Sequence, residues 1–145
     1  MRGWVWLALV VALGVVGTRQ AMAQSLEERR MHAAREGELA QAAEITDRAC
    51  GTHLKTGFAW STFDSGQALS QNVVSWCRAA LDAMEDLCSD AMGKQAVSEK
   101  VKALTCAGAG APAASLAPDG TLTFSFSLTP NQNKLLVRDY LDKNL

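Results

Sequence analysis

The chain has few of the residues that catalysis and metal binding most often use. It contains only two histidines, His32 and His53, and one tyrosine. Its four cysteines form no C-x-x-C motif, and neither a G-x-S-x-G motif nor a glycine-rich phosphate loop occurs. These absences argue against a zinc site, thioredoxin-like redox chemistry, a nucleophile-elbow hydrolase and nucleotide binding. We therefore expect no metal and no cofactor.

An excess of positive charge is also missing. Without the first 23 residues, which include Arg2 and Arg19, 12 basic residues face 15 acidic ones, a formal charge of −3. The basic residues alternate with acids along the chain and form no cluster, which argues against a nucleic-acid partner and against binding to an anionic membrane surface.

The N-terminal segment has the features of a cleavable signal peptide. Arg2 precedes an apolar run over residues 4–16, which is shorter than the roughly 20 residues of a membrane-spanning helix. Small residues at Ala21 and Ala23 predict cleavage before Gln24. We expect residues 1–23 to be removed, and the rest to be periplasmic or secreted without stable membrane insertion.

The exported part retains all four cysteines, and an even number in an oxidising compartment indicates two disulfides. Cys77 and Cys88 fall on one predicted helix about 16 Å apart, too far to bond to each other. The predicted helix and strand directions bring Cys88 back to Cys50 and Cys106 back to Cys77. We therefore expect the pairs Cys50–Cys88 and Cys77–Cys106.

Hydrophobic periodicity predicts the remaining elements. Residues 24–36 form a polar, frayed helical start, and residues 37–145 form a single domain. Helices are expected over residues 25–49, from residue 67 to Cys88, along a face with Val97, Val101 and Leu104, and after the N-cap pair Thr129-Pro130. Strands are expected over residues 54–63 and 121–128, with residues 107–118 as a loop and a turn at Pro118-Asp119-Gly120. The fold class is α+β, a small antiparallel sheet packed against helices.

Several short motifs resemble small exported four-cysteine bacterial proteins of uncharacterised function. The motifs are Trp76-Cys77, Leu87-Cys88, Leu104-Thr105-Cys106, the run from Asp119 to Phe124 and the run from Val137 to Leu141. The resemblance covers about residues 50–145 and implies export without implying an activity.

The candidate binding residues are Phe63, Trp60, Asp64 and His53. Aromatic rings beside polar atoms often hold sugars, peptides or partner proteins. Phe58 and Trp60 share a predicted strand face and are expected to fill the core, whereas Phe63 has the opposite parity and is the candidate for an exposed ring. Asp64 is the only acid beside these large rings, and His53 precedes the same strand.

Four acids from Asp82 to Asp90 are expected to form a solvated helix face and not a catalytic pair. With no catalytic constellation, the leading hypothesis is an exported non-enzymatic protein that binds a protein partner or an envelope component, as inhibitors, immunity proteins and assembly factors do. One alternative is a small periplasmic hydrolase that uses Asp64 and His53. Another is a carrier of a small apolar ligand between sheet and helices.

Overall fold

The computed structural model describes residues 14–70, 72–108, 110–127 and 130–145. Its contacts divide the chain into two units, residues 1–34 and residues 35–145. Most of the predicted signal-peptide core, and Thr129 of the predicted N-cap pair, lie outside the described residues. Within the described part of the chain, no helix is long and apolar enough to cross a membrane.

The helix α1 (Gly14–Cys50) includes the predicted cleavage position and begins earlier than the expected residue 25. In the first unit, the side chains of residues 26–30 are all exposed. In the second unit, the helix buries Leu39, Ala43, Thr46 and Cys50. It ends where Gly51 adopts a φ of 71°, a left-handed conformation that glycine accepts without strain.

Five further helical segments belong to the second unit: η1 (Trp60–Thr62), α2 (Ser65–Leu69), α3 (Val73–Leu87), α4 (Ala91–Lys100) and α5 (Pro130–Asn144). Aspartates begin two of them, because the carboxylate of Asp64 accepts from the amide of Gln67 and that of Asp90 accepts from the amides of Met92 and Gly93. The sequence predicted α3 and α5 because their apolar positions recur at helical intervals.

Gly93 lies inside the first turn of α4. A Cβ at this position would lie 2.0 Å from the carbonyl oxygen of Leu87, at the end of α3. Glycine is therefore required for the close approach of α4 to α3, and Asp90 marks the true helix start.

The sheet has four strands in the order β1 (Lys55–Phe58), β2 (Ala103–Ala107), β4 (Thr121–Ser125) and β3 (Ala113–Leu116). β1, β2 and β4 are mutually parallel, and only β3 pairs antiparallel, with β4. The α+β class is confirmed, but the expectation of an antiparallel sheet is wrong. The crossover through α2, α3 and α4 makes β1 and β2 parallel, since such a connection returns the chain to the same end of the sheet.

Other expected boundaries also change. The helix expected from residue 67 to Cys88 is divided into α2 and α3, and the strand expected over residues 121–128 ends at Ser125. The strand predicted over residues 54–63 ends at Phe58, and η1 follows it. Leu104, expected on a helix face, lies in the central strand β2. The segment expected as a loop over residues 107–118 contains the edge strand β3.

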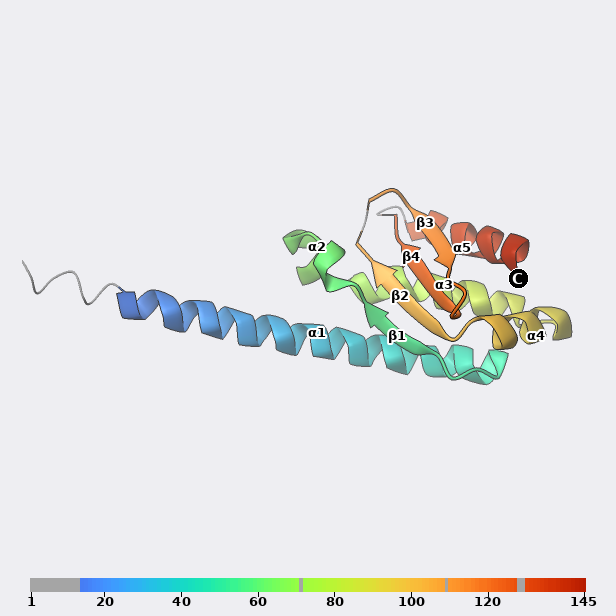
Figure 1. Cartoon of the computed structure of the whole chain (residues 1–145), viewed down its shortest axis with the longest axis horizontal. Helices are drawn as coiled ribbons and strands as arrows, with labels where there is room; N and C mark the ends of the chain where they lie inside the picture. Colours follow the sequence, from blue (N-terminus) through green and yellow to red (C-terminus); the bar gives the residue numbers. More distant parts are fainter. Residues whose placement is uncertain (1–13, 71, 109, 128–129) are drawn as a thin grey trace, which may run out of the picture. The chain divides into compact units, whose positions relative to one another are not determined.

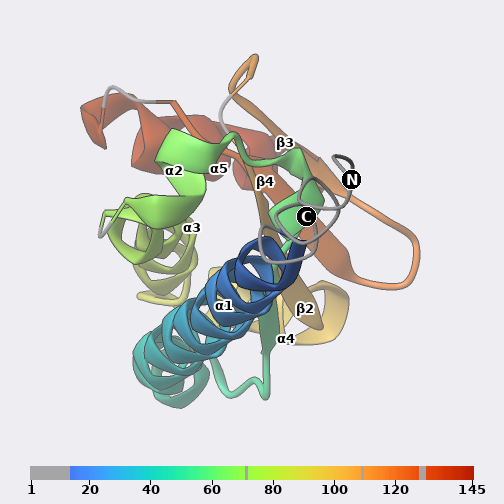
Figure 2. The ribbon, with the colours of Figure 1, turned by 90° about the vertical axis from the view of Figure 1, so that its left-hand side faces the viewer.

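Packing is concentrated on one face of the sheet. In Figure 1 this face lies away from the viewer, and the turned view of Figure 2 shows α3 and α5 on one side of the strands. Buried side chains of that face include Leu104, Cys106, Leu122 and Phe124, which pack against the helices. Burying such a side chain stabilises the fold by about 1.5–3 kcal/mol, so this layer dominates the stability of the unit.

Both predicted disulfides are confirmed. The Cα atoms of Cys50 and Cys88 lie 5.2 Å apart, and those of Cys77 and Cys106 lie 5.9 Å apart. Cys88 caps the end of α3 and joins it to the end of α1, whereas Cys77 faces the middle of β2. The chain returns to Cys77 along a strand and not along a helix, but its direction is the one that the sequence predicted.

Candidate functional site

The structure separates His53 from Asp64. His53 precedes β1, whereas Asp64 follows η1 beyond the other end of that strand. The Asp64 carboxylate accepts a 2.8 Å hydrogen bond from the amide of Gln67, whose side chain accepts from the amide of Asp64 at 3.3 Å. This capping box gives Asp64 a structural role. The geometry therefore does not assemble the acid–base pair that the hydrolase alternative requires.

Trp60 and Phe63 belong to a cluster of five aromatic rings at the carboxyl end of the parallel strands. The ring centroid of Phe63 lies 5.3 Å from that of Trp60 and 5.7 Å from that of Phe126. The ring centroids of Phe126 and Trp76 lie 4.8 Å apart. Phe58 is buried as expected, and its ring lies 4.7 Å from that of Trp60. These rings fill the end of the core.

Phe63 is half-buried in this cluster and is not an exposed ring. The parity argument fails because the strand ends at Phe58, and the turn of η1 redirects the chain before Phe63. Trp60 is also held in place, since its Nε1 donates a 2.9 Å hydrogen bond to the carboxylate of Glu36.

The sheet has a second face that the helices of residues 35–145 leave uncovered, and Figure 1 looks onto it. We call this surface the open face. The register aligns Gly57, Thr105, Thr123 and Ser115 in one row across all four strands. The flanking rows contribute Lys55, Ala103, Thr121, Ala107, Ser125 and Ala113. Of these ten residues only Ala107 is buried, and Lys55 is the only charged one.

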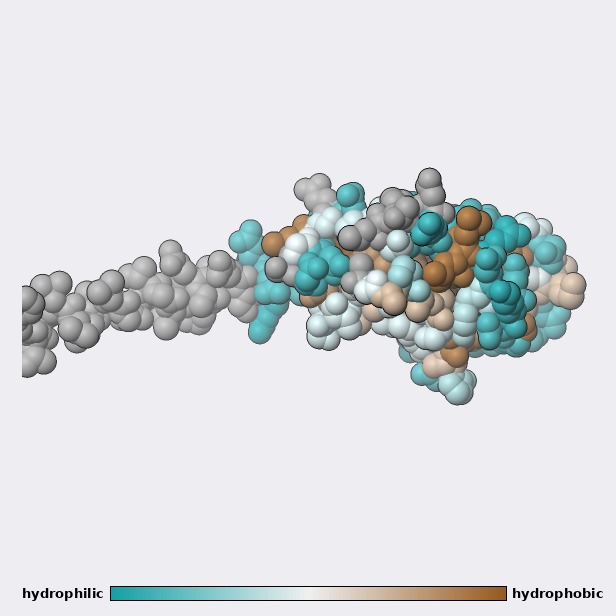
Figure 3. Space-filling view, turned by 90° about the horizontal axis from the view of Figure 1, so that it is seen from above, coloured by the Kyte–Doolittle hydropathy of each residue, from teal (hydrophilic) through white to brown (hydrophobic). Residues whose placement is uncertain are grey.

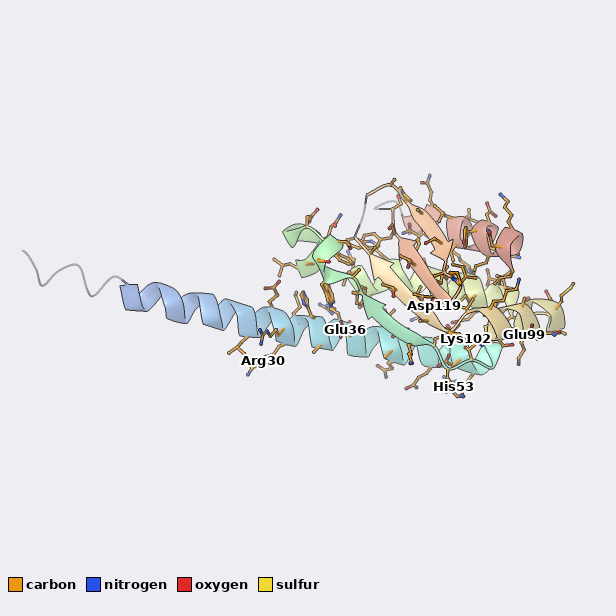
Figure 4. The ribbon with its side chains drawn as sticks, viewed as in Figure 1. Arg30, Glu36, His53, Glu99, Lys102 and Asp119 are labelled. Carbon is orange, nitrogen blue, oxygen red and sulfur yellow. A yellow bond between two sulfur atoms is a disulfide. The ribbon has the colours of Figure 1, made fainter. Side chains whose placement is uncertain are left out.

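A hollow of about 500 Å³ adjoins the open face where the parallel strands begin. We call it the amino-end hollow. It is lined in part by His53, Lys55, Ser98, Lys102, Asp119 and Thr121. Figure 4 shows His53, Lys102 and Asp119 at this end of the sheet. They come from three loops that are distant in sequence but converge because β1, β2 and β4 all start here.

The turn between β3 and β4 shapes one wall of the amino-end hollow. Gly120 has a φ of 85° and donates from its amide to the carbonyl of Ala117 at 2.9 Å. Its carbonyl accepts from the amide of Lys102 at 2.8 Å. This arrangement confirms the predicted turn at residues 118–120, which needs glycine because an L side chain is strained at this φ.

Lys102 is fixed beside this turn. A Cβ at Gly120 would lie 2.7 Å from Cγ of Lys102, so the lysine stem passes closely over the glycine. Its Nζ donates to the carbonyl oxygen of Ser98 at 2.6 Å. The bond to Ser98 therefore holds the ammonium group at the rim of the hollow.

Asp119 contributes the negative charge of the amino-end hollow. The backbone amide of Thr121 donates to its carboxylate at 2.9 Å. This bond, together with one from the Thr121 side chain, holds the pKa of Asp119 below its ordinary value. Asp119 thus stays ionised, and its bond to Thr121 fixes the start of β4.

Lys102 and Asp119 also line a second hollow, of about 440 Å³.

The acids of α3 do not form a further site. Asp86 accepts from Lys134 at 2.8 Å and from Arg138 at 3.4 Å, and Asp82 pairs with Arg78 at 3.5 Å. The bond to Asp86 raises the pKa of Lys134. These contacts tie α3 to α5 on the surface. In the described ranges, no group of three histidine, cysteine, aspartate or glutamate residues could hold a metal ion.

Exposed apolar side chains of the second unit come singly from separate helices: Ile45, Leu69, Met92 and Leu135. On the surface seen in Figure 3, hydrophilic residues interrupt the hydrophobic ones. Isolated exposed apolar residues are ordinary on soluble proteins and do not define a docking patch.

Comparison with family models, with curated proteins and with solved structures found no protein similar to this chain. The site is therefore argued from its own geometry. Sequence reasoning identified His53 but missed Lys55, Lys102, Asp119 and the threonines of the open face. Their only sequence signals were the turn at residues 118–120 and the alternation of threonine and serine with apolar residues after it.

Proposed function

We propose that this chain is an exported, non-enzymatic protein that binds a protein partner through the open face of its sheet. The observation that carries the proposal is that the described helices of residues 35–145 leave one face of three parallel strands uncovered. Parallel strands are almost always covered on both faces. A partner protein supplies the missing layer.

The composition of the open face supports a protein partner over permanent contact with water. The open face consists almost entirely of threonine, serine, alanine and glycine, and Lys55 is its only charged residue. Short side chains in register give a flat surface on which another protein can pack closely. Their hydroxyl groups can donate and accept hydrogen bonds across such an interface.

Neither alternative function has comparable support. The hydrolase needs Asp64 and His53 together, and they lie at opposite ends of β1. A carrier of apolar ligands needs space between the layers. Leu81, Met84, Leu104 and Phe124 occupy that layer with no exposed surface, and both described hollows lie at strand ends.

The disulfides support the export part of the proposal. All four cysteines are described and none is free. Disulfides persist in oxidising compartments such as the periplasm and the extracellular medium. The predicted signal peptide and the resemblance to small exported four-cysteine proteins point in the same direction and belong to the same proposal.

Affinity capture from an envelope extract, with the signal peptide removed, tests the proposal. We expect one stoichiometric partner to be retained by the wild-type protein and lost by Thr123→Arg, which places a long cation in the middle of the open face. Ser75→Arg is the matched control, since Ser75 is exposed on α3 in the helical layer. Equal retention by both variants, or the absence of a stoichiometric partner, would contradict the proposal.

A further inference from the structure

We infer that the amino-end hollow is a carboxylate site, which binds an acidic side chain or the free chain end of the partner. The inference rests on the proposed function and names the chemistry that the partner must present beside the open face.

The first argument is an imbalance of charge around the amino-end hollow. Lys55 and Lys102 line it, and Cε of Lys94 lies 3.6 Å from the position of a Cβ at Gly51, another lining residue. Over the described residues, none of these three lysines has a carboxylate within 4.0 Å. By contrast, the cations between α3 and α5 are paired with acids.

The second argument is that the site is already organised. Lys102 is held by the carbonyl of Ser98 and by its passage over Gly120, so little side-chain entropy remains to be lost on binding. The ammonium groups of Lys55 and Lys102 lie on the same lining and can donate to an anion. Charged hydrogen bonds of this kind are stronger than neutral ones.

Asp119 decides which anion fits. Its carboxylate accepts from Thr121 and stays ionised, so it offsets part of the lysine charge. A dianion such as phosphate meets more repulsion from this group than a single carboxylate does. The site therefore suits a monoanion.

Position connects the hollow to the open face. Lys55, Ala103 and Thr121 form one row of the sheet register and also line the amino-end hollow. A peptide segment whose carboxylate occupies the hollow can therefore continue over the rows of Thr105 and Thr123. One partner can use both surfaces at once.

A titration followed by NMR tests the site without the partner. The probes are three acetylated pentapeptides of glycine: one amidated with a central glutamate, one amidated with a central glutamine, and one all-glycine with a free carboxyl end. We expect saturable shifts of the amide signals of Lys55, Ala103 and Thr121 with a carboxylate peptide but not with the glutamine peptide. A response to the glutamate peptide alone assigns the site to an acidic side chain, and a response to the all-glycine peptide alone assigns it to a chain end.

Variants complete the test. Lys102→Gln and Lys55→Gln should each weaken binding by at least about threefold, since each removes a charged contact. Lys134→Gln is the control, because Lys134 is engaged with Asp86 elsewhere. The inference is overturned if no carboxylate peptide shifts these signals, if the glutamine peptide acts equally, or if both Lys102→Gln and Lys55→Gln bind as wild type. None of these results would affect partner capture that depends on Thr123. The two experiments therefore test the carboxylate site and the open-face interface independently.

Discussion

At the scale of single residues, aspartates organise the loops that join the elements. Asp47 near the end of α1 accepts from the hydroxyl of Thr52 at 2.7 Å and from the amide of Leu54 at 2.9 Å. Asp64 and Asp90 are the N-caps of α2 and α4, and the carboxylate of Asp119 accepts from the amide of Thr121 at the start of β4. Side-chain carboxylates satisfy backbone amides that would otherwise lack partners. The acids that the sequence offers for chemistry are thus largely used for local structure.

Replacing Asp119 by asparagine should make the stability less dependent on pH. A pKa that is lower in the folded state stabilises the fold above the ordinary aspartate range, and this contribution is lost as pH falls through the folded value. We expect Asp119→Asn to lower the urea midpoint at neutral pH and the difference to shrink in acid. Asp139→Asn, at an exposed position of α5, is the control. A difference that stays constant down to low pH would show that the Asp119 charge does not contribute.

Gly93 should not tolerate a side chain. The carbonyl oxygen of Leu87 lies 2.0 Å from the position of its Cβ, so Gly93→Ala must displace backbone at the α3–α4 junction. We expect a loss of about 1–3 kcal/mol in the free energy of unfolding, typical of overpacking. Gly57→Ala is the matched control, because no atom lies within 4 Å of its Cβ position. Equal unfolding free energies for the two variants would contradict the packing of this junction.

At the scale of elements, local sequence patterns predicted the helices and strands whose own residues show a clear hydrophobic period. The apolar positions of α3 and α5 recur at helical spacing, and the alternation from Thr121 onward indicates a strand. β2 was missed because Leu104 continues the helical spacing of Val97 and Val101, while pairing with β1 and β4 makes it a strand. β3 was hidden in a segment rich in alanine, glycine and proline, and it is defined by its register with β4.

The candidate site was harder to predict for the same reason. The turn at Gly120 has a local signal, but the open face exists only after four strands from distant segments are aligned. Lys55 and Lys102 come to the same hollow because β1 and β2 are parallel, which no local pattern encodes. His53 and Asp64 flank the same extended segment, and the strand β1 between them keeps them apart.

The two disulfides should contribute unequally. Their partners are separated by 38 and 29 residues, so the loop-closure terms differ by only about 0.2 kcal/mol. Cys77 and Cys106 are fully buried in the centre of the core, whereas Cys88 is 9% exposed. We expect the double variant Cys77→Ala/Cys106→Ala to lose about 3–5 kcal/mol, more than Cys50→Ala/Cys88→Ala, in urea unfolding. The reverse order would show that the α1–α3 link matters more than the core link.

At the scale of the whole molecule, the fold resides in residues 35–145. This unit contains the sheet and both disulfides, and its buried core begins at Leu39. The exposed edge strand β3 is partly protected, since the amide of Leu116 donates to the hydroxyl of Tyr140 at 2.7 Å. Such protection limits strand addition at this edge of the sheet.

Removal of residues 24–34 from a chain that starts at Gln24 should leave the stability almost unchanged. The side chains of residues 26–30 are exposed, so their loss removes little buried apolar area. We expect the urea midpoint of a chain that starts at Arg35 to match that of the longer form. A drop of several kcal/mol in the free energy of unfolding would contradict the division of the chain into these units.

The most direct measurement of the central claim is site-specific photo-cross-linking in cells that produce the protein. A photoreactive amino acid replaces Thr123 or Ser115 on the open face, or Ser75 on the helical side as the control. The account predicts the same cross-linked protein from Thr123 and Ser115 and none from Ser75. Cross-links from Ser75 alone, or none from either open-face position, would contradict it.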